Sequence, residues 1–167
     1  MAYKNKNSTK VVINNNSRDD IKFWMTGGVS VQGFSHIAEN IPCQDAHFIK
    51  TNGEYLFMAV ADGAGSASLS DIGSKEYAKN VIENMSLKIS DSSFDNDKIK
   101  AIFIESVELV SEKLITENTN LEGEGVRLSD FYSTIIIFIA NANEGLFIHV
   151  GDGAGSAFQY EDISKAI

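Results

Sequence analysis

The stretch VADGAGSA occupies residues 60–67, and the nearly identical stretch VGDGAGSA occupies residues 150–157. Each copy directly follows a short run of β-branched and aromatic residues, which is typical of a β-strand. An aspartate at the end of a strand, followed by Gly-x-Gly, holds a carboxylate in place while the backbone approaches a ligand closely. Because the residues around the two copies do not otherwise align, we interpret them as convergence on one local need and not as a repeat architecture.

Two groups of short apolar runs predict β-strands around these motifs. The first group comprises residues 46–49 and 55–61, joined by a turn at residues 51–53. The second group is expected to form three antiparallel strands, at residues 133–140, 146–150 and 156–160. The first strand of this second group is nearly continuously apolar, so we expect it to be covered on both faces of the sheet.

Apolar residues at helical spacing predict two helices between the two groups of strands. The first has Ser70 or Asp71 as its N-cap, and the second covers residues 97–118. Strands, then two helices, then strands indicate an α+β fold. Residues 1–20 hold five asparagines and little apolar content, which predicts a disordered or weakly ordered leader before the folded part.

The composition of the chain excludes several classes of function. Its 167 residues include 23 acidic and 14 basic side chains, and the net charge of −9 argues against binding to nucleic acid or to anionic membranes. The longest apolar run, residues 135–140, is far shorter than the roughly 20 residues that span a bilayer. The single cysteine, Cys43, cannot form an internal disulfide, so we expect a reducing, cytoplasmic setting. An anionic substrate would need a bound cation to attract it.

Oxygen donors in the two motifs predict a site for Mg²⁺ or Mn²⁺. Asp62 and Asp152 follow predicted strands, and Gly63 offers a backbone carbonyl. Asp45 opens another predicted strand, and if the two strands pair, Asp45 and Asp62 lie near the same end of the sheet. An Asp-Gly turn in which the carboxylate caps backbone amides is the better explanation for one copy, but two identical copies favour a ligand site. His36 is a candidate for facing phosphate.

The chain resembles the bacterial branch of the PPM (type 2C) family of metal-dependent protein phosphatases in four ordered motifs. These are SHIAENIPCQDA at 35–46, FMAVADGAGSASLSDIGSKEYA at 57–78, DFYSTIIIFIA at 130–140 and LFIHVGDGAG at 146–155. The resemblance implies an α-β-β-α sandwich of two antiparallel sheets flanked by antiparallel helix pairs. It also implies a centre of two Mn²⁺ or Mg²⁺ ions that hydrolyses phosphoserine or phosphothreonine in a protein by metal-activated water. The implied partner is a phosphorylated protein, either a Ser/Thr kinase or the target of one.

The resemblance also assigns roles to individual residues. Asp62 would bridge the two ions, Gly63 would coordinate through its carbonyl oxygen, and Asp45 would reach the second ion through water. Asp62 and Asp45 are therefore the implied catalytic residues. Asp152 matches the aspartate that some members use for a third, weaker ion, and residues 133–134 match a Ser-Thr pair with a mainly structural role.

Three departures from the family pattern stand beside these assignments. Ala64 occupies the position where many eukaryotic members have a histidine thought to protonate the leaving group. Where the family usually has a phosphate-binding arginine, this chain has Ser35 and His36, so His36 is the expected phosphate ligand. The family places two further metal-binding aspartates well downstream of the second motif, and residue 167 follows Asp152 by only 15 positions. We therefore expect residues 21–167 to be the N-terminal portion of a phosphatase domain that lacks its C-terminal part. The alternative is a non-catalytic module that binds a phosphoprotein or regulates a kinase.

Overall fold

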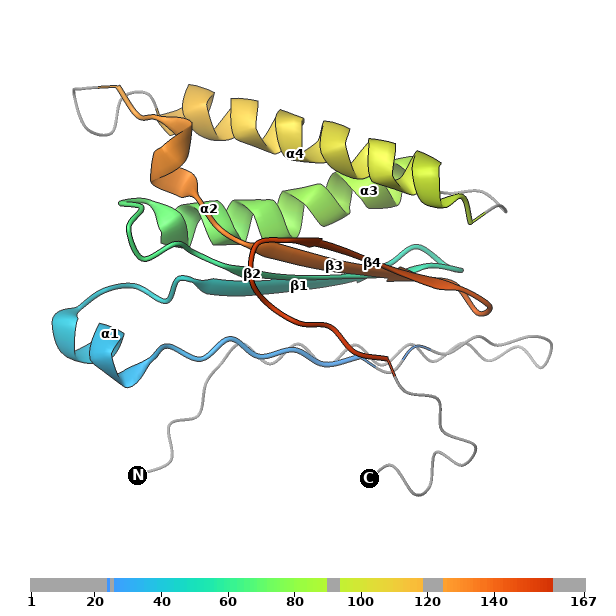
Figure 1. The fold of residues 1–167 in the computed structure, drawn as a ribbon, viewed down its shortest axis with the longest axis horizontal. Helices are drawn as coiled ribbons and strands as arrows, with labels where there is room; N and C mark the ends of the chain where they lie inside the picture. Colours follow the sequence, from blue (N-terminus) through green and yellow to red (C-terminus); the bar gives the residue numbers. More distant parts are fainter. Residues whose placement is uncertain (1–23, 25, 90–93, 119–124, 158–167) are drawn as a thin grey trace, which may run out of the picture.

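The computed structural model describes residues 24, 26–89, 94–118 and 125–157. Its strands are β1 (Asp45–Thr51), β2 (Leu56–Asp62), β3 (Ile135–Ala140) and β4 (Gly145–Val150). Its helical elements are α1 (Phe34–Glu39), α2 (Ser70–Glu76), the π-helical turn η1 (Tyr77–Val81), α3 (Ile82–Lys88), α4 (Asn96–Asn118) and the 3₁₀ turn η2 (Leu128–Phe131). The predicted α+β character and the two predicted helices are confirmed. The first predicted helix has a π-helical turn, η1, between α2 and α3; Figure 1 shows the whole run lying on the sheet.

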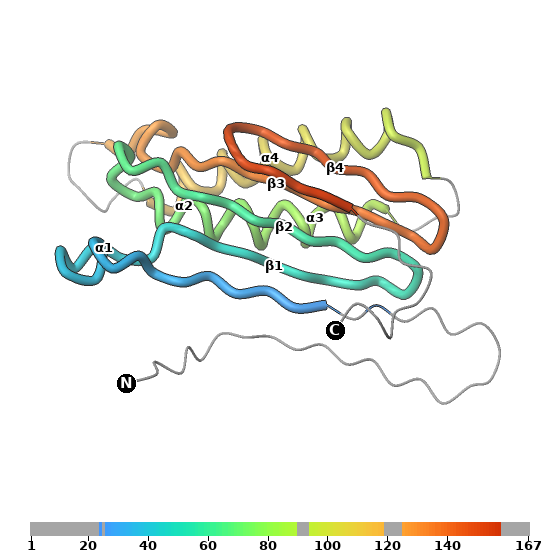
Figure 2. Tube along the Cα trace, turned by 60° about the horizontal axis from the view of Figure 1, so that its bottom comes forward, coloured from blue at the N-terminus to red at the C-terminus, as the bar shows by residue number. Residues whose placement is uncertain are grey.

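The four strands form one antiparallel sheet in the order β1-β2-β3-β4 (Figure 2). Side chains alternate between the two faces of a strand, so one face carries the fully buried Phe57, Ile137 and Ile139. The opposite face carries Met58 and Phe138, which are only half-buried. The described residues thus form one sheet with one well-covered face.

The helices cover that buried face (Figure 1). The continuous run α2–η1–α3 packs on β1 and β2 and buries Val81, Ile82 and Met85 completely. The long helix α4 packs on η1 and α3. The Tyr77 hydroxyl forms a hydrogen bond with Ser111 Oγ at 2.8 Å, which links the two helical runs. No helix in the described part of the chain is long and apolar enough to cross a membrane.

Residues 26–33 run along β1 on the side away from the helices (Figures 1 and 2). Ser30 Oγ forms a hydrogen bond with His47 Nδ1 at 2.9 Å. A Cβ at Gly28 would lie 2.4 Å from His47 Cδ2, so a larger residue here would require the His47 ring to shift. This segment leads into α1 and then into β1.

Residues 151–157 pass over the other half of the same open face (Figure 1). Gly153 lies beside Ile136, and Gly155 lies beside Phe147. Ile136 is still half-buried, and the neighbouring Val60 is 54% exposed. The prediction that the strand at 135–140 is covered on both faces is therefore right for the helix side, and on the other side the described residues cover it only in part.

Two predicted details are wrong. Residues 156 and 157 are not in a strand, and the remainder of the predicted strand, 158–160, lies outside the described residues. The N-cap position of α2 is Leu69 and makes no capping side-chain hydrogen bond. Ser70 Oγ instead accepts a hydrogen bond from Gln44 Nε2 at 2.8 Å, because it is buried against the loop before β1. The predicted leader, residues 1–20, also lies outside the described residues.

Candidate metal and phosphate site

Two carboxylates face each other at one end of the sheet. Asp45 is the first residue of β1, Asp62 is the last residue of β2, and the two are direct partners in the antiparallel register. Ala61 is buried on the helix side, so the alternation of the strand places Asp62 on the opposite face. The prediction that pairing of these strands brings Asp45 and Asp62 together is confirmed.

The electrostatics of Asp62 show what else lies nearby. Its pKa is raised, first by partial burial at the end of the strand, although the side chain remains exposed. The charge of Asp45, a hydrogen bond with the Asp45 side chain and the charge of Asp152 raise this pKa further, whereas His36 lowers it. His36 is half-buried on α1, and Asp152 is exposed in the loop after β4. Asp45, Asp152 and His36 thus all lie close enough to Asp62, at one end of the sheet, to affect its pKa. Their assigned roles stay predictions.

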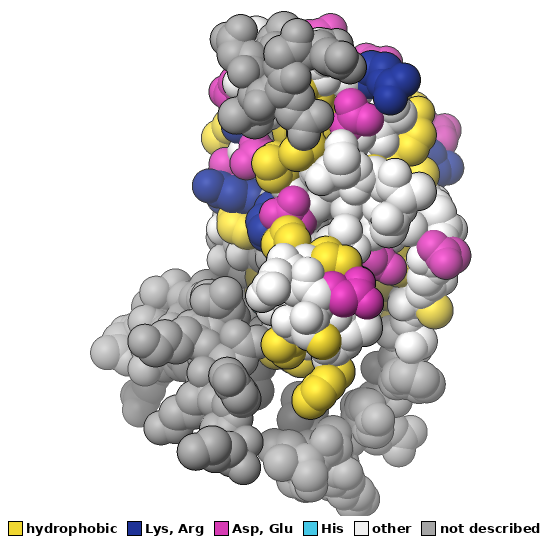
Figure 3. Space-filling view, turned by 90° about the vertical axis from the view of Figure 1, so that its left-hand side faces the viewer, with side chains coloured by type: hydrophobic (Ala, Val, Ile, Leu, Met, Phe, Trp, Pro, Cys, Tyr) yellow, Lys and Arg dark blue, Asp and Glu magenta, His cyan; other side chains and the backbone are white. Residues whose placement is uncertain are grey.

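The same end of the molecule faces the viewer in Figure 3. Acidic side chains lie at and to the right of the middle of the described surface there, and no Lys or Arg side chain is visible beside them. Since like charges at close range disfavour ionisation, a bound cation would relieve this concentration of negative charge.

Gly63 is held against the start of α2. A Cβ at this position would lie 2.7 Å from the Ser70 carbonyl oxygen and 2.8 Å from Ser70 Cβ, so only glycine fits. Its N–H donates a hydrogen bond to the Gln44 carbonyl at 3.0 Å, and no described residue donates to its own carbonyl oxygen. That oxygen is therefore available to a ligand as far as the described residues are concerned.

Gln44 supports the site and was missed in the sequence analysis. Its backbone accepts the Gly63 N–H, and its side chain donates to Ser70 Oγ. It therefore joins the start of β1, the end of β2 and the start of α2. The available signal was its place directly before Asp45.

Thr134 holds the backbone of Asp62 from the β3 side. Its N–H donates to the Asp62 carbonyl at 2.7 Å, and its Oγ1 accepts the Asp62 N–H at 3.2 Å. The preceding Ser133 bridges to Gly63 in the same antiparallel sense. These contacts are structural, as the sequence analysis expected of the Ser-Thr pair.

The donors fit a divalent cation in kind but do not complete its coordination. Mg²⁺ prefers octahedral oxygen coordination, and Asp45, Asp62 and the Gly63 carbonyl are oxygen donors of the right type. Yet residues 24, 26–89, 94–118 and 125–157 contain no group of three or more His, Cys, Asp or Glu side chains placed to hold a metal ion. Water and further protein ligands would have to fill the remaining positions.

Comparison with known proteins assigns the chain to a family. A model of the protein phosphatase 2C family matches residues 32–164. The chain belongs to this family. It is also similar to "Serine/threonine-protein phosphatase 3" of Escherichia coli (strain K12), with 27% identity over 135 residues. That match covers 78% of this chain and 51% of the relative, so the chain spans about half the length of that phosphatase. Both motifs of this protein phosphatase 2C chain lie inside the matched region.

Proposed function

We propose that this chain forms the N-terminal part of a divalent-metal-dependent phosphatase that acts on phosphoserine and phosphothreonine in proteins. The observation that carries the proposal is the direct pairing of Asp45 with Asp62 at the end of the β1–β2 hairpin. Membership of the protein phosphatase 2C family and the similarity to a serine/threonine-protein phosphatase support it. For the complete domain, we propose the two-sheet sandwich of the family, with the second sheet on the face that the described residues leave partly open.

The residues of this chain would divide the work at the site. Asp62 and the Gly63 carbonyl would hold one ion, Asp45 would orient water toward a second ion, and Asp152 would serve a third. Mn²⁺ or Mg²⁺ bound there would supply positive charge to the phosphoryl oxygens and lower the pKa of an attacking water. His36, which acts electrostatically on Asp62, would donate a hydrogen bond to the phosphoryl group.

The same chain carries no histidine between the glycines of its first motif. Ala64 lies there, and it is half-buried with its N–H donating to the Tyr132 carbonyl at 2.8 Å. A methyl group cannot transfer a proton, so water would protonate the leaving alkoxide. We further propose that the substrate is a cytoplasmic phosphoprotein, either a Ser/Thr kinase or the target of one.

Release of p-nitrophenol from p-nitrophenyl phosphate in Mn²⁺ tests the chemistry, on both the 167-residue chain and the complete domain. The Asp62→Asn variant is expected to lose activity, because it removes a ligand charge. Asp97→Asn is the matched control, since the Asp97 side chain is 98% exposed at the start of α4. Equal activity of Asp62→Asn and the wild type would refute the proposal.

Calorimetric titration with Mn²⁺ separates the enzyme from the alternative of a non-catalytic module. The proposal expects saturable binding that Asp62→Asn weakens and Asp97→Asn retains. No binding at millimolar Mn²⁺ in the complete domain would favour the module. This measurement does not depend on turnover, so it tests the site even where a chain lacks activity.

A further inference from the structure

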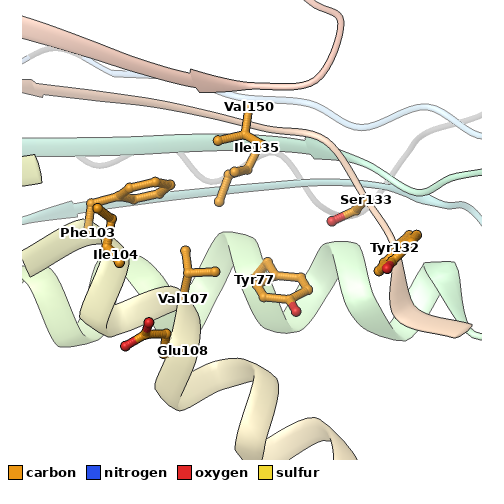
Figure 4. A pocket seen from close by; sticks show the side chains of 9 residues that line it. All are labelled: Tyr77, Phe103, Ile104, Val107, Glu108, Tyr132, Ser133, Ile135 and Val150. Carbon is orange, nitrogen blue, oxygen red and sulfur yellow. The ribbon is translucent and has the colours of Figure 1, made fainter. Parts of the chain in front are cut away.

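A groove of about 240 Å³ opens between α4 and the end of the sheet that bears the carboxylates (Figure 4). Phe103 and Val107 line it from α4, Tyr77 from η1, and Ile135 and Val150 from β3 and β4. Figure 4 shows the side chains of Val107, Tyr77 and Ile135 directed toward the same space. The groove is therefore a gap where α4 and the sheet do not close on each other.

The walls of this groove are apolar and open to solvent. Ile104 and Tyr132 are each 57% exposed, and Val150 is 51% exposed. Adjacent exposed apolar side chains of this size mark a binding surface more often than single exposed ones do. The Oγ atom of Ser133, which also lines the groove, is buried and has no hydrogen-bond partner among the described residues. A buried hydroxyl without a partner is costly, and a peptide bond placed in the groove would offer it one.

The groove opens at the same end of the sheet as the acidic site but on the helix side, whereas Asp62 lies on the opposite face. Val150 on its wall is followed at once by Gly151 and Asp152. Ser133 on its floor bridges to Gly63, whose carbonyl belongs to the site. A peptide that crosses this end of the sheet, with its phosphorylated residue at the carboxylates, would bring a neighbouring residue to the groove.

The size and charge of the groove decide what it accepts. Small-molecule sites typically have volumes of roughly 300–1,000 Å³, so this groove suits one amino-acid side chain better than a cofactor. Glu108 lies exposed at its rim, on a chain whose net charge is −9. An acidic rim beside an apolar groove favours a basic residue next to an apolar one.

We propose that this groove binds one large apolar side chain close to the phosphorylated residue of the substrate, and that Glu108 selects a basic residue beside it. The identity of the occupant as a substrate rests on the proposed function. The groove would then set the sequence preference of the enzyme, while the carboxylate end supplies the chemistry.

The test measures binding, so that it does not depend on turnover. Fluorescent peptides carry a non-hydrolysable phosphonate in place of phosphothreonine, and one leucine is moved through each position on either side of it. Anisotropy of the wild-type chain in Mn²⁺ compares each leucine peptide with its serine counterpart. Burial of one leucine side chain predicts about tenfold tighter binding at one or two adjacent positions.

Two groove variants and one matched control locate the effect. Ile104→Ser is expected to abolish the leucine preference. Leu109→Ser makes the same kind of change at another exposed position of α4 and is expected to retain it, since Leu109 lies outside the groove. Glu108→Lys is expected to reverse a preference for lysine over glutamate next to the leucine, and as a surface change it leaves the packing of α4 intact.

The outcomes separate this inference from the proposed function. Equal binding of leucine and serine peptides at all positions, or a preference that survives Ile104→Ser, overturns the groove assignment. So does a dimer, detected by sedimentation, that Ile104→Ser dissociates, because a second copy would then occupy the groove. If p-nitrophenyl phosphate is not hydrolysed but the Ile104-dependent preference remains, the phosphatase proposal fails and the groove stands as a peptide-binding site.

Discussion

Substitution of Gly63 by alanine gives the sharpest test of how the site is held together. The added Cβ would lie 2.7, 2.8 and 2.9 Å from the O, Cβ and C atoms of Ser70, all closer than real contacts of this kind. Ser70 is 1% exposed at the start of α2, so it cannot move without shifting the helix. Overpacking typically costs about 1–3 kcal/mol, and contact with backbone atoms places this case at about 2–3 kcal/mol.

Gly65→Ala provides the reference for Gly63→Ala. It lies two residues further along the same loop, and a Cβ there meets nothing within 4 Å. Both changes remove the same flexibility from the unfolded chain, which is worth about 0.4–1 kcal/mol, so the difference between the two variants isolates the contact with Ser70. For a chain of this length, a difference of about 2–3 kcal/mol corresponds to melting temperatures about 4–12 °C apart.

Thermal unfolding followed by circular dichroism measures this difference. Gly63→Ala should melt below the wild type and Gly65→Ala at or slightly above it. A Gly63→Ala protein as stable as Gly65→Ala would show that the end of β2 does not lie tightly against α2, and the account of the site's rigidity would fail.

Three further outcomes are expected. Gly73→Ala places a Cβ 2.1 Å from the Phe131 carbonyl oxygen. It should therefore lower the midpoint of urea unfolding at least as much as Gly63→Ala does. An unchanged midpoint would contradict the packing of α2 on η2. Thr134→Val keeps the shape of the side chain but removes the acceptor of the Asp62 N–H. Urea titration should show a loss of about 1 kcal/mol of stability, and calorimetry should show weaker binding of Mn²⁺. Unchanged stability and affinity would show that Thr134 does not position Asp62. The last outcome concerns pH, measured in EDTA to keep metal ions away. Because the pKa of Asp62 is raised in the folded chain, the folded chain binds more protons at this group than the unfolded chain above about pH 3.9. The free energy of unfolding therefore falls as pH rises through the folded pKa of Asp62. Asp62→Asn should therefore gain stability relative to the wild type with rising pH in thermal melts, and a constant difference between the two would contradict the shift.

The elements with clear periodicity were predictable from the sequence. β1 and β2 alternate or run apolar between turn residues, and α4 has apolar residues at helical spacing with Asp95 as its cap. The carboxylates could be placed because aspartates lie at strand ends, and antiparallel pairing brings such ends together. The strand order and the single sheet of the described residues needed the structure, since several pairings satisfy the same apolar pattern.

Other features leave no such pattern in the sequence. Helix α1 has only six residues, and its Phe34 is 90% exposed, so it lacks the apolar stripe that predicts a helix. The π-helical turn after Glu76 adds no distinct residue type. The role of Gln44 arises from tertiary contact with Ser70, which lies 26 residues away. The groove beside α4 likewise results from how the helix sits on the sheet.

The facing positions of Asp45 and Asp62 also restrict how the lengths of this hairpin can change. Insertion or deletion of one residue inside β1 or β2 would turn the side chains between the change and the carboxylate end of that strand to the other face, and its carboxylate would point into the helices. Residues 52–55 join the strands at the opposite end, so extra residues accommodated there would leave the pairing intact. Natural length variation in this part of the family should therefore concentrate at the tip of the hairpin.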